Sequence, residues 1–305
     1  MNQPLFWILF NLFVIVMLAL DLGVFHRGGG HVVKVREAML WSVAWITMAA
    51  IFALIVLFWH GRTPALEFVT GYVIELSLSI DNLFVFLLIF RFFKVSPEHQ
   101  HRVLFWGIIG ALVMRAIFIV VGVGLISRFA WITYIFGLLL LFSGIKLFLQ
   151  KESEIHPEHN PVLKLVRKLI PVTKDYEGGK FFIRKPQLYA TPLFIVLIVV
   201  ETTDVAFAVD SIPAILAITL NAFIVYTSNV FAIMGLRSMY FALAGLMEMF
   251  RYLHYGLSLV LSFIGVKMLI HHYYQIPTHW ALAAVAGILL ISVLASLVHP
   301  AQETA

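Results

Sequence analysis

The sequence predicts an all-α polytopic membrane protein with about nine transmembrane helices and a mid-membrane acidic site. The chain is 62% hydrophobic and only 12% charged, with a mean hydropathy of +0.97, well outside ordinary soluble composition. Its apolar runs are long enough to cross a bilayer, which takes about 20 helical residues. Carboxylates interrupt these runs at two matched places. We expect residues 1–305 to form a single transmembrane domain.

Nine apolar runs, separated by polar connections, define the predicted helices in order. They lie at about residues 5–24, 40–59, 69–90, 103–126, 130–149, 191–219, 222–246, 254–273 and 279–298. Several of the predicted starts carry helix-capping signals, such as Ser96-Pro97-Glu98 and Asn221. No Lys or Arg precedes the first run, so we expect a retained helix there and not a cleaved signal peptide.

Lys and Arg alternate between the predicted connections. The first, third and fifth connections carry most of them, and the fifth, at about 150–190, is the richest. The positive-inside rule therefore places the odd-numbered connections in the cytoplasm, the N-terminus outside and the C-terminus inside. This distribution also explains the formal charge of +5 without nucleic-acid binding.

Two segments, at about 69–149 and 191–273, share polar landmarks in the same order. The matched pairs are Glu75 and Glu201, Asp81 and Asp210, Arg115 and Arg237, Gly144 and Gly265, and Lys146 and Lys267. Each segment contains three predicted helices, an odd number, so the second copy enters the membrane from the opposite side. The sequence therefore predicts two inverted three-helix repeats, with a binding site where the repeats meet.

Five carboxylates lie inside these apolar runs, where each costs roughly 2.5–3.5 kcal/mol on insertion scales. They must therefore face an interior, either protonated, paired or holding a cation. The candidate ligands are Glu75, Asp81, Glu201, Asp204 and Asp210, with possible support from Ser79, Asn82, Thr202 and Ser211.

The ligand chemistry of this cluster favours a hard cation. The chain has no cysteine, and none of its 12 histidines lies deep in a predicted span. Oxygen ligands alone suit Mn²⁺, Mg²⁺ or Ca²⁺. The alternative, in which the carboxylates only pair with Arg115, Arg237 or Lys267 to hold helices together, stays open. We expect the two arginines to neutralise part of the cluster, and Lys146 and Lys267 to snorkel from helix ends.

Straight helices cannot aim all of these carboxylates at one point. Glu201 and Asp204 lie about 60° apart on an ideal helix, while Asp210 points away from Glu201. Pro213 cannot donate to the carbonyl of the residue four positions earlier. We therefore expect a non-helical stretch around Asp210–Pro213 that lets Asp210 approach Asp81.

Two long acidic segments carry a family resemblance. GYVIELSLSIDNLFVF and ETTDVAFAVDSIPA, together with DLGVFHR in the first connection, resemble signature segments of the TerC family, over about residues 10–295. The chain is most similar to the Alx-type members, which consist of the membrane domain alone. The resemblance implies a bacterial inner-membrane protein associated with metal-ion homeostasis, and it implies the same five acidic positions.

We expect a secondary transporter that exports a divalent cation, first of all Mn²⁺, in exchange for protons. No cofactor is expected to be permanently bound, since the cation is the transported substrate. The expected partners are the lipid bilayer and this cation. No nucleotide-binding loop or hydrolytic motif is present, so we do not expect an enzyme. Two alternatives remain: an exporter of a small organic solute such as an amino acid, and a non-transporting scaffold or sensor in metal or pH stress.

The charge asymmetry predicts that residue 170 lies in the cytoplasm. A reporter enzyme that is active only in the cytoplasm should be active when fused at residue 170 and inactive when fused near residue 221. The opposite pattern would refute both the orientation and the inverted relation between the repeats.

Overall fold

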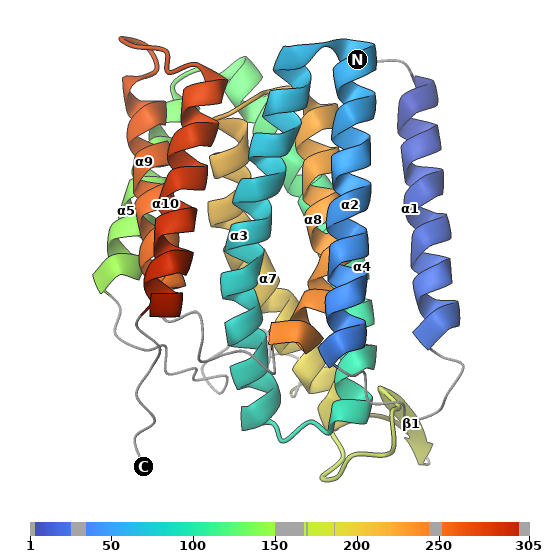
Figure 1. The fold of residues 1–305 in the computed structure, drawn as a ribbon. Helices are drawn as coiled ribbons and strands as arrows, with labels where there is room; N and C mark the ends of the chain where they lie inside the picture. The colour runs from blue at the N-terminus through green and yellow to red at the C-terminus, as the bar shows by residue number, and fades with distance from the viewer. Residues whose placement is uncertain are drawn as a thin grey trace.

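The computed structural model describes residues 4–25, 35–149, 168, 170–185, 187–243 and 252–298. Over these residues it confirms the all-α class, with nine helices that run alongside one another (Figure 1). The helices are α1 (Pro4–Phe25), α2 (Val35–His60), α3 (Arg62–Phe92), α4 (Pro97–Arg128), α5 (Ile132–Leu149), α7 (Pro192–Leu216), α8 (Ala222–Leu243), α9 (Leu253–Ile270) and α10 (Thr278–Val298). Two short strands, β1 (Phe182–Lys185) and β2 (Gln187–Ala190), form an antiparallel hairpin before α7.

Length and surface chemistry identify this bundle as a membrane domain. Eight of the described helices, α2 to α5 and α7 to α10, are long and apolar enough to cross a bilayer. The ninth, α1, contributes the apolar stretch Pro4–Leu20. Large apolar side chains point outward along the helices; Leu40 is 71% exposed and Phe142 is 68% exposed. Soluble monomers rarely show such continuous apolar surface, whereas lipid solvates it.

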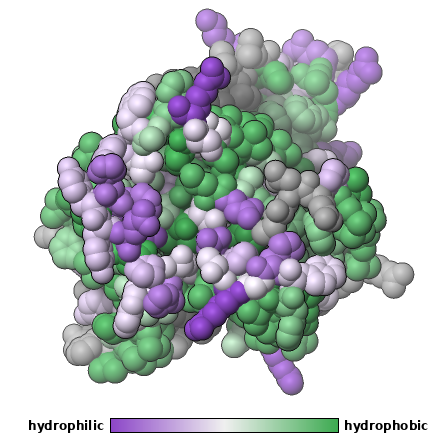
Figure 2. Space-filling view, turned by 90° about the horizontal axis from the view of Figure 1, so that it is seen from above, coloured by the Kyte–Doolittle hydropathy of each residue, from purple (hydrophilic) through white to green (hydrophobic). Residues whose placement is uncertain are grey.

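The connections between helices fall at two ends of the bundle. The α3–α4 connection and the β1–β2 hairpin lie at the lower end in Figure 1, and the α2–α3, α7–α8 and α9–α10 connections lie at the upper end. We call these ends the hairpin face and the opposite face. Figure 2 looks down on the opposite face, where hydrophilic residues gather across the middle and hydrophobic residues occupy much of the rim.

The packing of the helices follows the predicted inverted repeat. Helices α3 to α5 form one copy and α7 to α9 the other, and the corresponding helices α3 and α7 run in opposite directions (Figure 1). Helix α3 of the first copy packs against α8 of the second, and the equivalent helix of the second copy, α7, packs against α4 of the first. Each remaining pair of corresponding helices, α5 with α9 and α4 with α8, also packs together. A two-fold axis in the membrane plane would produce this pattern.

Small residues bring α5 and α9 close together in a symmetric way. A Cβ atom on Gly144 would lie 2.8 Å from the carbonyl oxygen of Ser258, and one on Gly265 would lie 2.8 Å from the carbonyl oxygen of Gly137. The repeat alignment pairs Gly144 with Gly265, and the same offset pairs Gly137 with Ser258. The two contacts are therefore symmetry copies. Close backbone approach at small residues is a main source of helix association in lipid.

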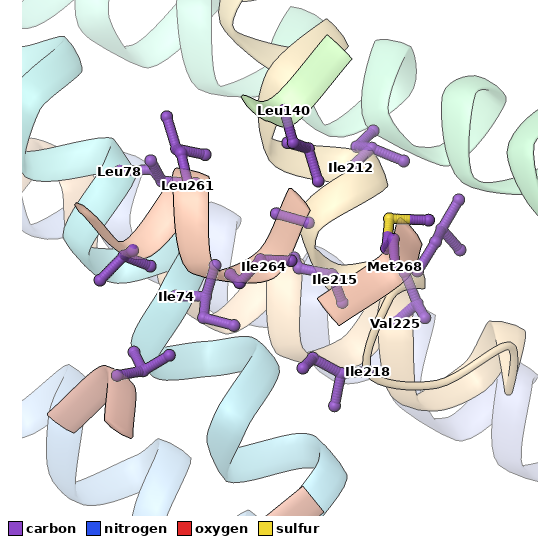
Figure 3. Packing of buried hydrophobic residues seen from close by; sticks show 14 of the residues in the cluster. Ile74, Leu78, Leu140, Ile212, Ile215, Ile218, Val225, Leu261, Ile264 and Met268 are labelled. Atoms are coloured by element: carbon purple, nitrogen blue, oxygen red, sulfur yellow. The ribbon is translucent and has the colours of Figure 1, made fainter. Parts of the chain in front are cut away.

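The largest buried cluster surrounds the C-terminal half of α7 (Figure 3). Ile212 and Ile215 pack there against Ile264 of α9. The predicted break at Asp210–Pro213 is wrong, because α7 continues through Pro213 to Leu216. Pro213 lies in the last turn, and its carbonyl accepts a hydrogen bond from the Ala217 N–H at 3.0 Å. Buried packing on both sides of the proline holds the helix in line.

The described part of the 150–190 connection folds against the hairpin face. The hydroxyl of Tyr176 donates to the carbonyl oxygen of Phe93 at 2.7 Å, and Arg102 donates to the carbonyl of Gly179. Burial raises the pKa of Tyr176 above its ordinary value, so the hydroxyl stays protonated and can donate at neutral pH. Residues 150–167, 169 and 186 of this connection lie outside the described residues.

The α5–α9 contact predicts a position-specific cost for added side chains. Gly265→Val should destabilise the protein by about 1–3 kcal/mol, because the new Cβ meets backbone atoms of α5 that cannot move alone. Gly287→Val on α10 is the matched control, since nothing lies within 4 Å of its Cβ position. Thermal unfolding of the detergent-purified variants should show the loss for the first variant only; equal effects would argue against close α5–α9 packing.

Candidate functional site

The guanidinium of Arg115 occupies the centre of the bundle. Arg115 lies midway along α4 and is only 1% exposed. Its Nη1 donates to the Glu75 carboxylate on α3, to the Ser211 hydroxyl on α7 at 3.2 Å and to the Asn229 amide oxygen on α8 at 3.1 Å. One buried cation therefore joins four helices from both repeats.

A second carboxylate faces the same guanidinium. Asp204 Oδ1 lies 3.5 Å from Nη2 of Arg115, while Glu75 pairs with Nη1. With all three groups ionised, two carboxylates surround one guanidinium and the cluster keeps an excess negative charge. The outer oxygens, Glu75 Oε2 and Asp204 Oδ2, are buried and accept no hydrogen bond from the described residues. These oxygens remain available as ligands.

The predicted supporting residues on α3 lie on the Glu75 face, as helix geometry predicts. Ser79 donates to Glu75 at 3.0 Å from one turn along the helix. Asn82 is 5% exposed, and its amide nitrogen has no partner among the described residues. Thr202 on α7 donates instead to the Ile198 carbonyl of its own helix at 2.8 Å.

Glu201 lies one turn from Asp204 and borders a small cavity of about 20 Å³. The cavity lies between α3, α4, α7 and α8, and its polar lining is Glu201, Asp204 and Arg237. Glu201 lies directly against the α4 backbone, because a Cβ atom on Gly110 would collide with its carboxylate. A volume of this size holds about one water molecule or one desolvated ion.

Arg237, the repeat counterpart of Arg115, has a different environment. It is 3% exposed and its Nη1 lies 3.2 Å from Nε2 of His101, on the first turns of α4. No hydrogen bond or ion pair joins Arg237 to Glu201 in the described structure. The two halves of the repeat therefore differ: Arg115 holds its carboxylate, and Arg237 is directed toward the hairpin face.

The remaining predicted ligands lie away from this cluster. Asp210 accepts a hydrogen bond from Ser143 of α5 at 2.8 Å, on a different side of α7 from Asp204. Asp81 is partly buried on α3. Within the described ranges, no hydrogen bond or ion pair joins Asp81 to Asp210, and no group of three His, Asp or Glu side chains lies close enough together to hold a metal ion.

Several residues that shape the site were not predicted from the sequence. Asn229 accepts from Arg115; the cost of burying a polar group in the run at 222–246 marks the residue as unusual but does not reveal its partner. Gly110 admits the Glu201 carboxylate and Ser143 binds Asp210. His101 meets Arg237 from a predicted helix end. Only the folded arrangement brings these last contacts together.

The site thus has two parts with different chemistry. Around Arg115, the Glu75 carboxylate is ion-paired and hydrogen-bonded. Beside it, Glu201 and Asp204 present carboxylate oxygens to a cavity of ion size. Carboxylate oxygens bind hard cations and also take up protons, so this part of the site can hold either.

Comparison with known proteins places the chain in a family. The chain is 50% identical over 298 residues to "Uncharacterized membrane protein STKORF319" of Myxococcus xanthus, covering 97% of this chain and 93% of the relative. It is 47% identical over 302 residues to "Putative membrane-bound redox modulator Alx" of Escherichia coli (strain K12), covering 95% and 94%. No solved structure matches. The family described as "Integral membrane protein TerC family" matches residues 60–304, and the chain belongs to this family.

Proposed function

We propose that this protein is a secondary transporter that exports a divalent cation, Mn²⁺ in the first instance, in exchange for protons. The observation that carries this proposal is the pair Glu201 and Asp204, which border an ion-sized cavity next to a buried cluster with more carboxylates than cations. Uncompensated carboxylates inside a membrane attract a cation or protons. On this proposal the protein is neither an enzyme nor the holder of a resident cofactor.

The difference between the two repeats supports transport by alternating access. The arginine alignment pairs Asn229 with Gly107. The Asn229 side chain accepts from Arg115 in one half, whereas Gly107 has no side chain and lines the cavity beside Glu201 in the other half. We infer that this conformation admits the cation from the hairpin face. If the two repeats exchanged these arrangements, the cavity would form in the other repeat and the cation would have access from the opposite face.

The membrane assignment follows the charge distribution. The basic connections at residues 93–96, 170–185 and 187–191 share the hairpin face (Figure 1), which the positive-inside rule places in the cytoplasm. We therefore propose a bacterial inner-membrane location, with the N-terminus outside and export directed from the hairpin face to the opposite face.

The alternatives fit the site less well. An amino-acid exporter would need a roomier site and an arginine available for the substrate carboxylate, but the cavity is about 20 Å³ and Arg115 is bound to Glu75 and Asp204. The name of the Alx relatives suggests a redox role for those proteins. This chain has no cysteine, so thiol chemistry within it cannot supply one. A non-transporting scaffold would have no use for carboxylates beside an ion-sized cavity.

Glu201→Gln should abolish Mn²⁺ export while leaving the protein inserted at its normal level. Glu201 makes no ion pair with the described residues, so neutralising it strands no buried partner, and an amide is easier to bury than a carboxylate. Intracellular Mn²⁺ and membrane abundance should be measured in the same cells. Glu98→Gln, at an exposed position on the first turn of α4, is the matched control. Unchanged Mn²⁺ at normal abundance would remove the transporter proposal and favour the scaffold.

Arg115→Gln should lower membrane abundance strongly, because removing one partner of a buried pair typically costs about 3–5 kcal/mol. Adding Glu75→Gln should recover part of the lost abundance, because the carboxylate that Arg115→Gln leaves without its partner is then replaced by a neutral amide. Quantitative membrane blots of the single and double variants check this coupling. Equal abundance of Arg115→Gln and the wild type would mean that the guanidinium does not hold the four helices together.

A further inference from the structure

Helix α1 lies at the edge of the bundle (Figure 1), and a cavity separates part of it from its neighbours. This α1 cavity measures about 310 Å³ and lies between α1, α2 and α8. Its lining extends from Phe6 to Phe13 on α1 and from Met48 to Trp59 on α2. At 1.5 Å per helical residue, the stretch of α2 is roughly 16 Å long. The α1 cavity is therefore elongated along the helix axes.

The depth of the α1 cavity matches one leaflet of a bilayer. Trp59 lies one residue before the end of α2 at the opposite face, and Met48 lies about halfway along this helix. The hydrocarbon core of a bilayer is about 30 Å thick, so each leaflet occupies roughly 15 Å of it. The α1 cavity therefore extends from the opposite-face surface to about mid-membrane.

The lining of the α1 cavity is apolar and aromatic throughout the described residues. Phe10, Phe223 and Phe231 are its buried wall, whereas Ile51 and Ile55 are exposed on the outer side of α2. An apolar cavity does not hold water, and an unfilled one leaves its wall atoms without contacts. An acyl chain of the surrounding lipid can fill it, because the chain is apolar and has access from the side.

The groups at the opposite-face end of the α1 cavity suit a phosphate. The exposed Arg62 begins α3, and arginine binds phosphate oxygens in a bidentate way. His60 ends α2, and its ring centroid lies 5.7 Å from that of Phe6. The Nδ1 atom of His60 has no hydrogen-bond partner among the described residues. Turning this ring toward a headgroup therefore breaks no hydrogen bond at Nδ1.

The charges near this end favour an anion. The acidic residues of α1 and α2 are Asp21 and Glu37, and both positions lie toward the hairpin face. The first turn of α3 has no acidic residue and no side-chain cap, so its first N–H groups present the positive end of the helix dipole. A zwitterionic headgroup would bring a cationic group that finds no partner here, whereas an anionic headgroup brings none.

We propose that the α1 cavity binds one acyl chain of an anionic phospholipid from the leaflet at the opposite face, with the lipid phosphate at Arg62 and His60. The lipid fills the space between α1 and α2 and holds α1 against the bundle. It adds to direct contacts such as the 2.8 Å hydrogen bond from Tyr226 to Asn11. This inference rests on the membrane fold and is independent of the proposed transport.

Native mass spectrometry of the detergent-purified full chain tests the proposal. The probe is phosphatidylglycerol, and the comparison is phosphatidylcholine with the same acyl chains. The wild type should bind one phosphatidylglycerol several-fold more tightly than phosphatidylcholine. Ile55→Trp narrows the α1 cavity and should weaken the binding of both lipids several-fold. Ile145→Trp, at an exposed position on α5, is the matched control and should bind as the wild type does.

A second pair of variants tests the headgroup. Arg62→Gln should remove the preference for phosphatidylglycerol, because only the anionic headgroup loses its partner. Arg128→Gln, at the exposed last residue of α4, is the matched control and should keep the preference.

Four results would overturn the proposal. Equal binding of the two lipids by the wild type would exclude headgroup recognition, and unchanged binding in Ile55→Trp would exclude an acyl chain in the α1 cavity. Full competition by inorganic phosphate would make Arg62 part of a free-phosphate site. Dimers that carry no lipid would make this face an interface between two copies of the chain.

A further measurement uses only the wild-type protein in vesicles and so does not depend on how the variants fold. A phosphatidylglycerol with a photoreactive group in its acyl chain should label residues 6–13 and 48–59 several-fold more than α5. Peptide mass spectrometry locates the label. Equal labelling of all the lipid-facing helices would contradict a bound chain.

Discussion

The buried ion pair between Arg115 and Glu75, with Asp204 beside it, is the constraint on which the rest of the structure depends. Lipid cannot solvate these charges, so the helices that carry them must stay in contact. The guanidinium bonds to α3, α7 and α8 from its place on α4. It therefore fixes the junction of the two repeats at mid-membrane. The peripheral helices α1, α2 and α10 surround this junction without contributing to it.

The repeat is symmetric in its packing and asymmetric in its charges. The α5–α9 interface is nearly symmetric. Gly144 of α5 contacts Ser258 of α9 in the same way as Gly265 of α9 contacts Gly137 of α5. The arginines break the symmetry: Arg115 donates to its matched carboxylate Glu75, whereas Arg237 contacts His101 and no described hydrogen bond joins it to Glu201. If the two halves of a symmetric scaffold carry different contacts, exchanging those contacts between the halves gives a second, equivalent conformation. This asymmetry is the physical basis on which we propose a transporter and not a static scaffold.

Much of the site could be predicted from the cost of burying charge. That cost identified Glu75, Asp204 and Arg115, and ideal helix geometry separated Asp210 from Glu201. Pairing across helices could not be predicted, because sequence spacing does not say that Asp210 meets Ser143. The Pro213 break was wrong because tertiary packing holds the last turn of α7 in place. Lys267 was expected to snorkel but is only 5% exposed, because its ammonium donates to the carbonyl oxygen of Ala217 at the end of α7.

The fold was more predictable than the site. Hydropathy located the nine helices, but α3 begins at Arg62 and not near residue 69, since helices extend past the hydrocarbon wherever protein surrounds them. The β1–β2 hairpin went unpredicted because it is short and lies in a connection dominated by charge. Asn229 was not predicted as a site residue, because a neutral amide lowers the hydropathy of an apolar run far less than a carboxylate does. Its role emerges only from contact with Arg115.

Flux through purified protein tests the central claim most directly. The wild-type chain should be reconstituted into vesicles that contain a Mn²⁺-sensitive dye, with an imposed pH gradient across the membrane. Our account predicts Mn²⁺ movement toward the more acidic side, which reverses when the gradient is reversed and is absent from protein-free vesicles. Vesicles that contain folded protein yet show no more Mn²⁺ flux than protein-free vesicles, under either gradient, would contradict it.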